Sequence, residues 1–185
     1  MNDSFGGQRL AVHPKTPARA VDSMFFNLTW RGAGRWVLEF YSSTPASSLR
    51  LPAPAEPTRA DELWKHTCCE LFLLNPVDGT YVEFNFSPSG QWAAYRFDGY
   101  RNGMRDLEVR RPHISASVPG DPHFHLRVDF EDPALRNPEP WQAGVSAVIE
   151  ETDGTKSYWA LAHGKENPDF HDAGAFAINL PAAQD

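Results

Sequence analysis

A stretch of mixed apolar and polar residues, Tyr81 to Phe97, carries four side chains suited to binding hydroxyl groups. It reads YVEFNFSPSGQWAAYRF, and the four side chains are Glu83, Asn85, Trp92 and Arg96. Carboxylates, amides and guanidinium groups bond the hydroxyls of a sugar, and an indole packs against the apolar face of a pyranose ring. The residue types therefore predict a small-ligand site, with a carbohydrate or a similar polyol as the ligand.

These four side chains come together only if the stretch forms a hairpin of one particular register. With a turn over residues 87–90, the pairing places Asn85 opposite Trp92 and Arg96 diagonal to Glu83, within side-chain reach. A register moved by one residue would turn half of this set to the other face of the sheet. The predicted grouping therefore depends on the length of the turn.

The strand before the hairpin adds a second carboxylate. If a Leu74–Tyr81 pair closes the preceding loop, Glu70 falls opposite Asn85. The predicted binding face then consists of Glu70, Glu83, Asn85 and Arg96, with Trp92 beside them. The alternative is an ordinary solvated sheet face with a surface ion pair, which is the default for an antiparallel sheet.

Two further tryptophans are candidates for stacking on a sugar. Trp64 precedes Glu70 by six residues in DELWKHTCCE, and Trp159 lies near a strand end in KSYWALAH. For any single indole the alternative is packing in the core, which is the preferred interpretation for Trp30, Trp36 and Trp141.

Other chemistries find less support. His123 and His125 share a strand face but lack a third ligand, and the spacing of His163 and His171 fits no zinc pattern. No Gly-x-Ser-x-Gly elbow occurs, and nothing marks the two cysteines as activated thiols. We therefore predict no metal site, no cofactor and no catalytic residue.

Glu70 and Glu83 could instead act as the carboxylate pair of an enzyme that acts on a sugar derivative. The separation of two such carboxyls decides the chemistry, and the sequence does not supply it. Arg96 beside Glu83 is expected to keep that glutamate ionised, which suits hydrogen bonding better than acid–base catalysis. A non-catalytic binding domain is the prediction, and the enzyme is an alternative.

The strand pattern predicts an all-β fold. The segment His123 to Phe130 alternates strictly between apolar and polar residues, as a half-buried strand does. Sixteen prolines and 13 glycines, spread along 185 residues, favour many short strands joined by turns. We predict one domain over residues 1–185, a single antiparallel β-sandwich or jelly roll, with flexible ends at about 1–7 and 182–185.

The charge and the termini limit the partners and the location. The formal net charge is −7 and no basic block stands out, so a nucleic acid or an anionic membrane is a disfavoured partner. No signal peptide is visible at the start of the chain, and adjacent Cys68 and Cys69 are poorly placed to form a disulfide with each other. A cytoplasmic bacterial protein with reduced cysteines is expected, and its oligomeric state is left open.

Two runs of the sequence resemble the DOMON-like superfamily. They are LWKHTCCELFLLNPVDGTYVEFNFSPSGQWAAYRF, residues 63–97, and WALAHGKENPDFH, residues 159–171. Within the superfamily the chain is most similar to the family-nine carbohydrate-binding modules and to uncharacterised bacterial DOMON-like proteins, from about Phe25 to Leu180. The resemblance implies an antiparallel β-sandwich with a ligand site on one face.

The resemblance also implies roles for particular residues. In the sugar-binding modules two tryptophans sandwich the sugar, and a glutamate and an arginine bond its hydroxyls. Trp64 and Glu70 match the spacing of the tryptophan and the glutamate. Arg96 and Trp159 are matched by strand order alone, and Asn85 is added by the strand pairing.

A haem-binding domain with a redox or sensing role is the second function that the resemblance implies. Haem-binding relatives hold the iron between a methionine and a histidine, and Met24 or Met104 could be paired here with His163 or His171. No matching motif surrounds these residues, so haem uptake is not expected. The sugar modules are usually secreted appendages of larger enzymes, whereas this chain shows no signal. The alternatives are therefore an intracellular sugar metabolite as the ligand, or another use of the pocket.

Overall fold

The computed structural model describes residues 4–32, 34–131 and 141–180, which consist of strands, loops and three short 3-10 turns. The strands are β1 (Ser4–Val12), β2 (Met24–Trp30), β3 (Arg35–Ser42), β4 (Cys68–Leu74), β5 (Tyr81–Phe86), β6 (Trp92–Phe97), β7 (Arg105–Asp106), β8 (His113–Ala116), β9 (Phe124–Glu131), β10 (Trp141–Glu150), β11 (Lys156–Ala160) and β12 (Ile178–Leu180). The turns are η1 (Ala46–Ser48), η2 (Leu63–Lys65) and η4 (Ala173–Ala175). The predicted all-β class is confirmed, and no helix in the described residues is long and apolar enough to cross a membrane.

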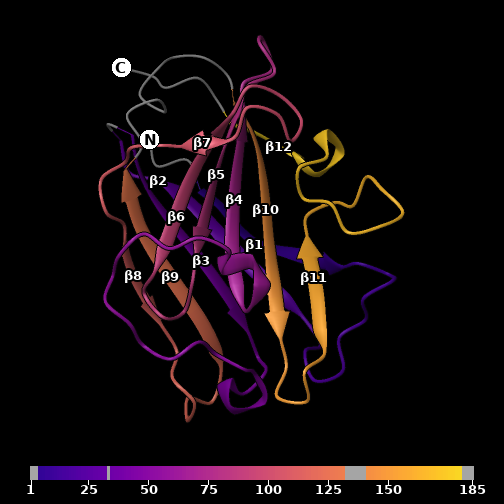
Figure 1. Cartoon of the computed structure of the whole chain (residues 1–185). Helices are drawn as coiled ribbons and strands as arrows, with labels where there is room; N and C mark the ends of the chain where they lie inside the picture. Colours follow the sequence, from indigo (N-terminus) through magenta and orange to yellow (C-terminus); the bar gives the residue numbers. More distant parts are fainter. Residues whose placement is uncertain (1–3, 33, 132–140, 181–185) are drawn as a thin grey trace.

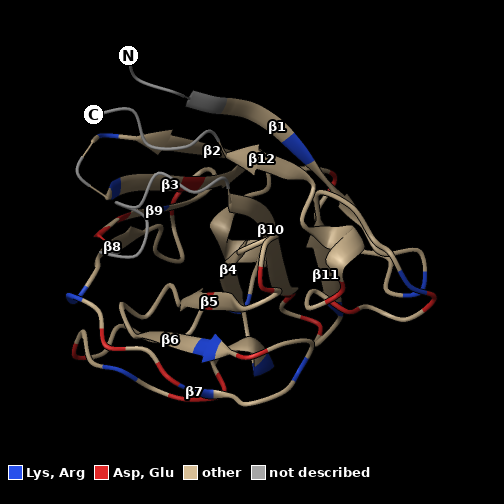
Figure 2. Cartoon of the chain, turned by 90° about the horizontal axis from the view of Figure 1, so that it is seen from above, with Lys and Arg blue, Asp and Glu red and all other residues tan. Residues whose placement is uncertain are grey.

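The strands form one strongly curled antiparallel sheet. Its order is β7-β6-β5-β4-β10-β11-β1-β2-β3-β9-β8, and β12 pairs with the beginning of β10. Strand β1 joins the two halves by pairing with β11 along one part of its length and with β2 along another. Figure 2 shows the two halves facing each other, with most charged residues in the loops and at the edges. The two layers of the predicted sandwich are thus halves of one continuous sheet.

The main core lies between these two halves. Phe130 on β9 meets Phe84 and Phe86 on β5, with ring centroids 5.3 and 5.7 Å apart. Strand β9 shows the predicted alternation, because Phe124, Leu126, Val128 and Phe130 are buried while the residues between them are not. Burial of such side chains is the main stabilising contribution to the fold.

A second apolar cluster covers the outer face of the half that contains β4, β5, β6, β10 and β11. It includes Phe72, Tyr81, Tyr95, Phe97, Phe170 and Phe176. Two long loops, over residues 98–104 and 161–177, and the turn η2 lie against this face (Figure 1). Every residue of β5 is therefore buried, on both faces of the sheet.

Several expectations concern residues at the margins. Residues 4–7, predicted to be flexible, belong to β1. The remaining predicted flexible ends, residues 1–3 and 182–185, lie outside the described residues. That the whole chain forms one domain stays a prediction.

Candidate functional site

The pairing of β4 with β5 brings the two glutamates onto one face, as predicted. Glu70 is opposite Asn85, and Phe72 is opposite Glu83. Glu70 and Glu83 are therefore diagonal neighbours on adjacent strands, within reach of each other. The predicted register of this strand pair is confirmed.

The predicted register of the following pair is wrong by one residue. Glu83 is opposite Tyr95 and Asn85 is opposite Ala93, because the connection spans residues 87–91 and closes with Ser87 N–H donating to the Gln91 carbonyl. Trp92 and Arg96 consequently lie on the face of the sheet opposite to the one that carries Glu83. Trp92 packs in the main core and Arg96 is exposed, so the structure does not bring them to the two glutamates.

Trp159 also lies away from the predicted face. It is opposite Ala147 on β10, it is 2% exposed, and it belongs to the main core between the two halves of the sheet. Its indole Nε1 donates to Ser157 Oγ at 2.8 Å, so its polar atom is satisfied inside the protein. Its neighbour Tyr158 faces the outer side of the sheet instead, where it is half-buried.

Trp64 does lie beside the two glutamates. It belongs to η2, and its ring meets the edge of Tyr95 with centroids 6.3 Å apart. Tyr95 in turn donates its hydroxyl to Asp61 at 2.6 Å, which fixes the loop before η2. The indole is half-exposed, as a stacking platform must be.

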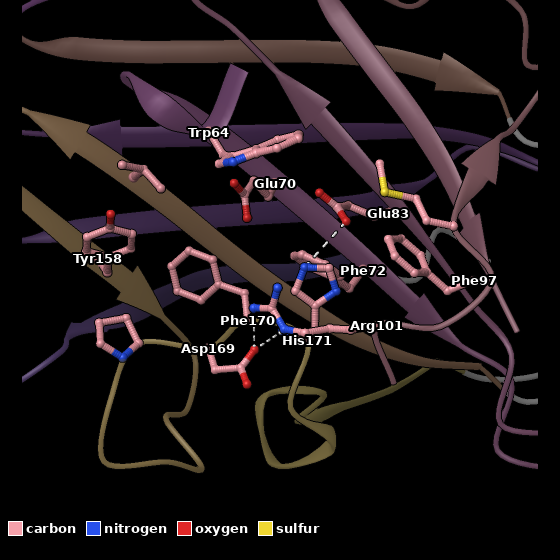
Figure 3. Close-up of a pocket in the computed structure, with 13 residues that line it drawn as sticks. Trp64, Glu70, Phe72, Glu83, Phe97, Arg101, Tyr158, Asp169, Phe170 and His171 are labelled. Carbon is pink, nitrogen blue, oxygen red and sulfur yellow. Dashed lines mark hydrogen bonds and ion pairs between the residues drawn. The ribbon is translucent and has the colours of Figure 1, made fainter. Parts of the chain in front are cut away.

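Trp64, Glu70 and Glu83 line a cavity of about 360 Å³ on the outer face of the sheet. This volume is within the range of small-molecule sites. Figure 3 shows the carboxyl groups of Glu70 and Glu83 beneath the Trp64 ring, with His171, Arg101 and Asp169 across from them. The complete lining is Trp64, Glu70, Phe72, Glu83, Phe97, Arg101, Met104, Val148, Tyr158, Pro168, Asp169, Phe170 and His171.

The two carboxyl groups are deeply buried, which excludes the solvated-face alternative for them. Glu70 is 2% exposed and accepts a hydrogen bond from Ser146 Oγ at 3.2 Å. Glu83 is 4% exposed and accepts one from Asn85 Nδ2 at 2.6 Å. Asn85 is fully buried beneath them, so it orients Glu83 and is not itself part of the lining.

Burial changes the acidity of both groups. It raises the pKa of Glu70 well above its usual value; the nearby charge of Glu83 adds to the rise, and the Ser146 hydrogen bond opposes it. Burial also raises the pKa of Glu83 to about 7, against the opposing effects of the Asn85 hydrogen bond and the Arg101 charge. The expectation that Arg96 keeps Glu83 ionised is therefore wrong, since Arg96 is on the other face.

A chain of polar contacts places His171 next to Glu83. The Arg101 backbone N–H donates to the Tyr81 hydroxyl at 3.1 Å, and that hydroxyl lies 2.8 Å from His171 Nδ1. His171 Nε2 is 3.7 Å from Glu83 Oε2. Because the Tyr81 oxygen already accepts one hydrogen bond, we assign its hydroxyl as the donor to Nδ1. The single N–H of the neutral ring is then on Nε2, which faces Glu83.

His171 is neutral in this setting. Burial, together with the positive charge of Arg101, lowers its pKa to about 4. The ring therefore offers Glu83 a hydrogen-bond donor without a positive charge at neutral pH.

Asp169 anchors the loops that carry Arg101 and His171. It pairs with Arg101 Nη2 and with Lys165 Nζ, each at 2.9 Å, and it also accepts from the Tyr100 hydroxyl. Although burial opposes it, these hydrogen bonds hold the pKa of Asp169 well below its usual value. Arg101 itself adopts a left-handed backbone conformation with φ +50°, an unusual geometry that is often found at functional sites.

Most residues that line the cavity were not predicted as binding residues; they include Arg101, Tyr158, Asp169, Phe170 and His171. Asp169, Phe170 and His171 belong to the run WALAHGKENPDFH, which was one of the two runs that carried the family resemblance. The resemblance of this run to the family was the one feature of the sequence that could have indicated these three residues as part of the site. Nothing in the periodicity marked Arg101, because it lies in a loop.

The residues considered for haem do not fit an axial pair. His171 has both ring nitrogens engaged, one with Tyr81 and one facing Glu83. His163 Nε2 lies 2.9 Å from the Ala11 carbonyl, and Met24 is fully buried in the main core. Met104 lines the cavity with His171, but the histidine could hold iron only after it had given up one of these contacts.

Comparison with known proteins supports the fold. No protein-family model matches the chain, and no curated protein sequence matches it. The crystal structure of a proposed carbohydrate-binding protein from Bacteroides uniformis matches with a TM-score of 0.68 and 16% identity, over 91% of this chain and 82% of that one. A family 9 carbohydrate-binding module from Caldicellulosiruptor kristjanssonii, in complex with glucose, matches with a TM-score of 0.45 and 11% identity, over 82% and 73% of the two chains. The match to the Bacteroides uniformis protein shows that the two chains share a fold.

Proposed function

We propose that this protein is a non-catalytic binding domain whose cavity takes up a monosaccharide or a similar polyol. The observation that carries the proposal is the cavity itself, in which an accessible indole lies over two buried carboxyl groups. Trp64 would stack on the apolar face of a sugar ring, while Glu70, Glu83 and Arg101 would bond its hydroxyls. The role of Arg101 replaces the one that the sequence suggested for Arg96.

Three further features support this ligand class. The cavity has apolar walls with a few convergent polar groups, which is typical of small-molecule sites. The polar groups are held by other side chains, so little ordering is needed on binding. The fold is shared with a proposed carbohydrate-binding protein, and the DOMON-like resemblance implies the same ligand class.

The Trp64→Ala variant is expected to bind the ligand about tenfold or more weakly while it remains folded. Stacking on an indole contributes on the order of 1–3 kcal/mol, and about 1.4 kcal/mol corresponds to tenfold. The half-exposed Trp64 belongs to a short turn outside the main core, so its loss leaves that core intact. Calorimetric titration with a panel of mono- and disaccharides identifies the ligand, and the best binder is then titrated into the variant.

Trp30→Ala is the matched control. Trp30 is another partly buried indole, but it is at the end of β2 and does not line the cavity. It should lose stability without loss of affinity. Equal binding by Trp64→Ala and by the unmodified protein would refute the stacking role.

An enzyme acting on a glycoside is a second candidate, because the structure brings Glu70 and Glu83 into one cavity. We expect no turnover of aryl glycosides, since burial favours the protonated form of both carboxyls and no Lys or Arg in the described residues forms an ion pair with either. A nucleophilic carboxylate would need to be held ionised. Reproducible hydrolysis that disappears in both Glu70→Gln and Glu83→Gln would replace the binding proposal with an enzymatic one.

A further inference from the structure

We infer that the cavity prefers an amino sugar, bound through its ammonium group, to the neutral sugar of the same shape. The inference rests on the proposed function, which it narrows from sugars in general to sugars with a basic amine. It comes from the juxtaposition, in one cavity, of several aromatic rings and two buried carboxyl groups, neither of which forms an ion pair with a lysine or arginine of the described residues.

The cavity holds more carboxyl groups than cationic side chains. Three carboxyl groups and one guanidinium line it, and that guanidinium, on Arg101, pairs with Asp169 at 2.9 Å. Glu70 and Glu83 form no ion pair with a lysine or arginine anywhere in residues 4–32, 34–131 and 141–180, and the nearby His171 is neutral. Ionising both glutamates would thus leave two buried negative charges without a partner, which is costly.

An ammonium ion supplies the missing charge and matches the free acceptors. Glu70 accepts one hydrogen bond, from Ser146, and Glu83 accepts one, from Asn85, with His171 at a longer distance. Each carboxylate has further lone pairs, and an ammonium group has three donors. A hydroxyl group donates only one hydrogen bond and carries no charge, so it cannot compensate the charge of an ionised glutamate.

The walls of the cavity also favour a cation. Five aromatic side chains contribute to the lining: Trp64, Phe72, Phe97, Tyr158 and Phe170. The face of an aromatic ring attracts a cation, most strongly in the case of tryptophan. Trp64 lies over the carboxyl groups in Figure 3, so a sugar stacked on this ring could direct an amine toward Glu70 and Glu83.

Binding of the ammonium ion should release protons from the protein. Without a ligand, burial favours the protonated forms of Glu70 and Glu83, and a bound cation favours the ionised forms. The titratable and charged groups around this pair are Cys68, Cys69, Tyr81, Tyr95, Arg101, Tyr158, Asp169 and His171. Among these, only Arg101 is a cation at neutral pH, and it is bound to Asp169.

The experiment is a calorimetric comparison of matched sugar pairs. Glucosamine, galactosamine and mannosamine are each titrated beside their neutral parent hexoses near neutral pH, in two buffers of different ionisation enthalpy. We expect at least one amino sugar to bind about tenfold or more tightly than its parent and to release protons. The double variant Glu70→Gln/Glu83→Gln should lose this preference, because its amides carry no charge.

The controls separate this inference from the proposed function. Glu151→Gln removes a different buried carboxylate, which accepts from the backbone N–H groups of Arg19 and Ala20 outside the cavity, and it should keep the preference. Neutral hexoses that bind as tightly as their amino forms would overturn the inference and leave the proposed function standing. Tight binding of cyclohexylamine with no binding of any sugar would overturn the proposed function, and the amino-sugar inference with it.

Discussion

Replacing Trp159 with alanine is expected to lower the free energy of unfolding by about 3–5 kcal/mol. The indole is 2% exposed and packs between the two halves of the sheet, so its loss leaves a cavity in the main core. The substitution would also remove the hydrogen bond that the fully buried Ser157 Oγ accepts from the indole N–H. Urea unfolding followed by circular dichroism measures the change.

Tyr158→Ala is the matched control for this prediction. Tyr158 precedes Trp159 on β11, but it points to the outer face, is half-buried and lines the cavity. It should cost much less stability than Trp159→Ala while it weakens ligand binding. If Trp159→Ala were as stable as the unmodified protein but failed to bind sugar, Trp159 would be the stacking residue that the sequence suggested.

The sequence could predict the β4–β5 part of the site because the short loop between these strands sets their register. A short loop with strong turn residues joins Leu74 to Tyr81, and this fixes which side chains face each other. Glu70, Glu83 and Asn85 were therefore placed correctly on one face. The period of two along each strand supplied the rest of that prediction.

The β6 part could not be predicted in the same way. Trp92 and Ala94 face the main core, while Ala93, Tyr95 and Phe97 face the outer cluster, so β6 is apolar on both sides. Either register buries apolar side chains, and the pattern gives no reason to choose one. The turn decides the register, since it spans one residue more than the sequence suggested.

The loop residues of the site depend on contacts that sequence spacing does not encode. Tyr81 and His171 are 90 positions apart and still share a hydrogen bond. Arg101 reaches the cavity from a connection between strands, where no period applies. Such residues are placed by the packing of loops against the outer face, which only the three-dimensional structure supplies.

The glutamate pair should make the protein less stable as the pH rises. A carboxyl with a pKa of about 7 in the folded protein, against a value near 4.5 in the unfolded chain, costs the folded state about 3 kcal/mol once it is ionised. The unfolded chain releases this proton at a lower pH than the folded protein does. The contribution of Glu83 to the free energy of unfolding is therefore fully present below pH 4.5 and is lost as the pH rises through 7. Glu70 acts in the same direction.

His171 has the opposite effect over part of this range. Its pKa falls to about 4 in the folded protein, against 6.5 in the unfolded chain, so it destabilises the fold as the pH falls from 6.5 toward 4. A pH profile of the unmodified protein alone would therefore mix the two effects. Comparison with a variant that retains His171 separates them.

The free energy of unfolding of Glu70→Gln/Glu83→Gln, relative to that of the unmodified protein, is expected to rise by roughly 3 kcal/mol or more between pH 4.5 and pH 8. Each glutamine retains an acceptor for its present donor, Ser146 or Asn85, but cannot ionise. The single variants should not add up to the double, because the charge of Glu83 raises the pKa of Glu70 and its removal makes Glu70 easier to ionise. Val82→Ala, a core change without an ionisable group, should shift the profile by a constant amount. The free energies of unfolding of the double variant and the unmodified protein could instead differ by the same amount at every pH in this range. That result would show that the two carboxyls are not buried without a compensating charge, and it would contradict the basis of the amino-sugar inference.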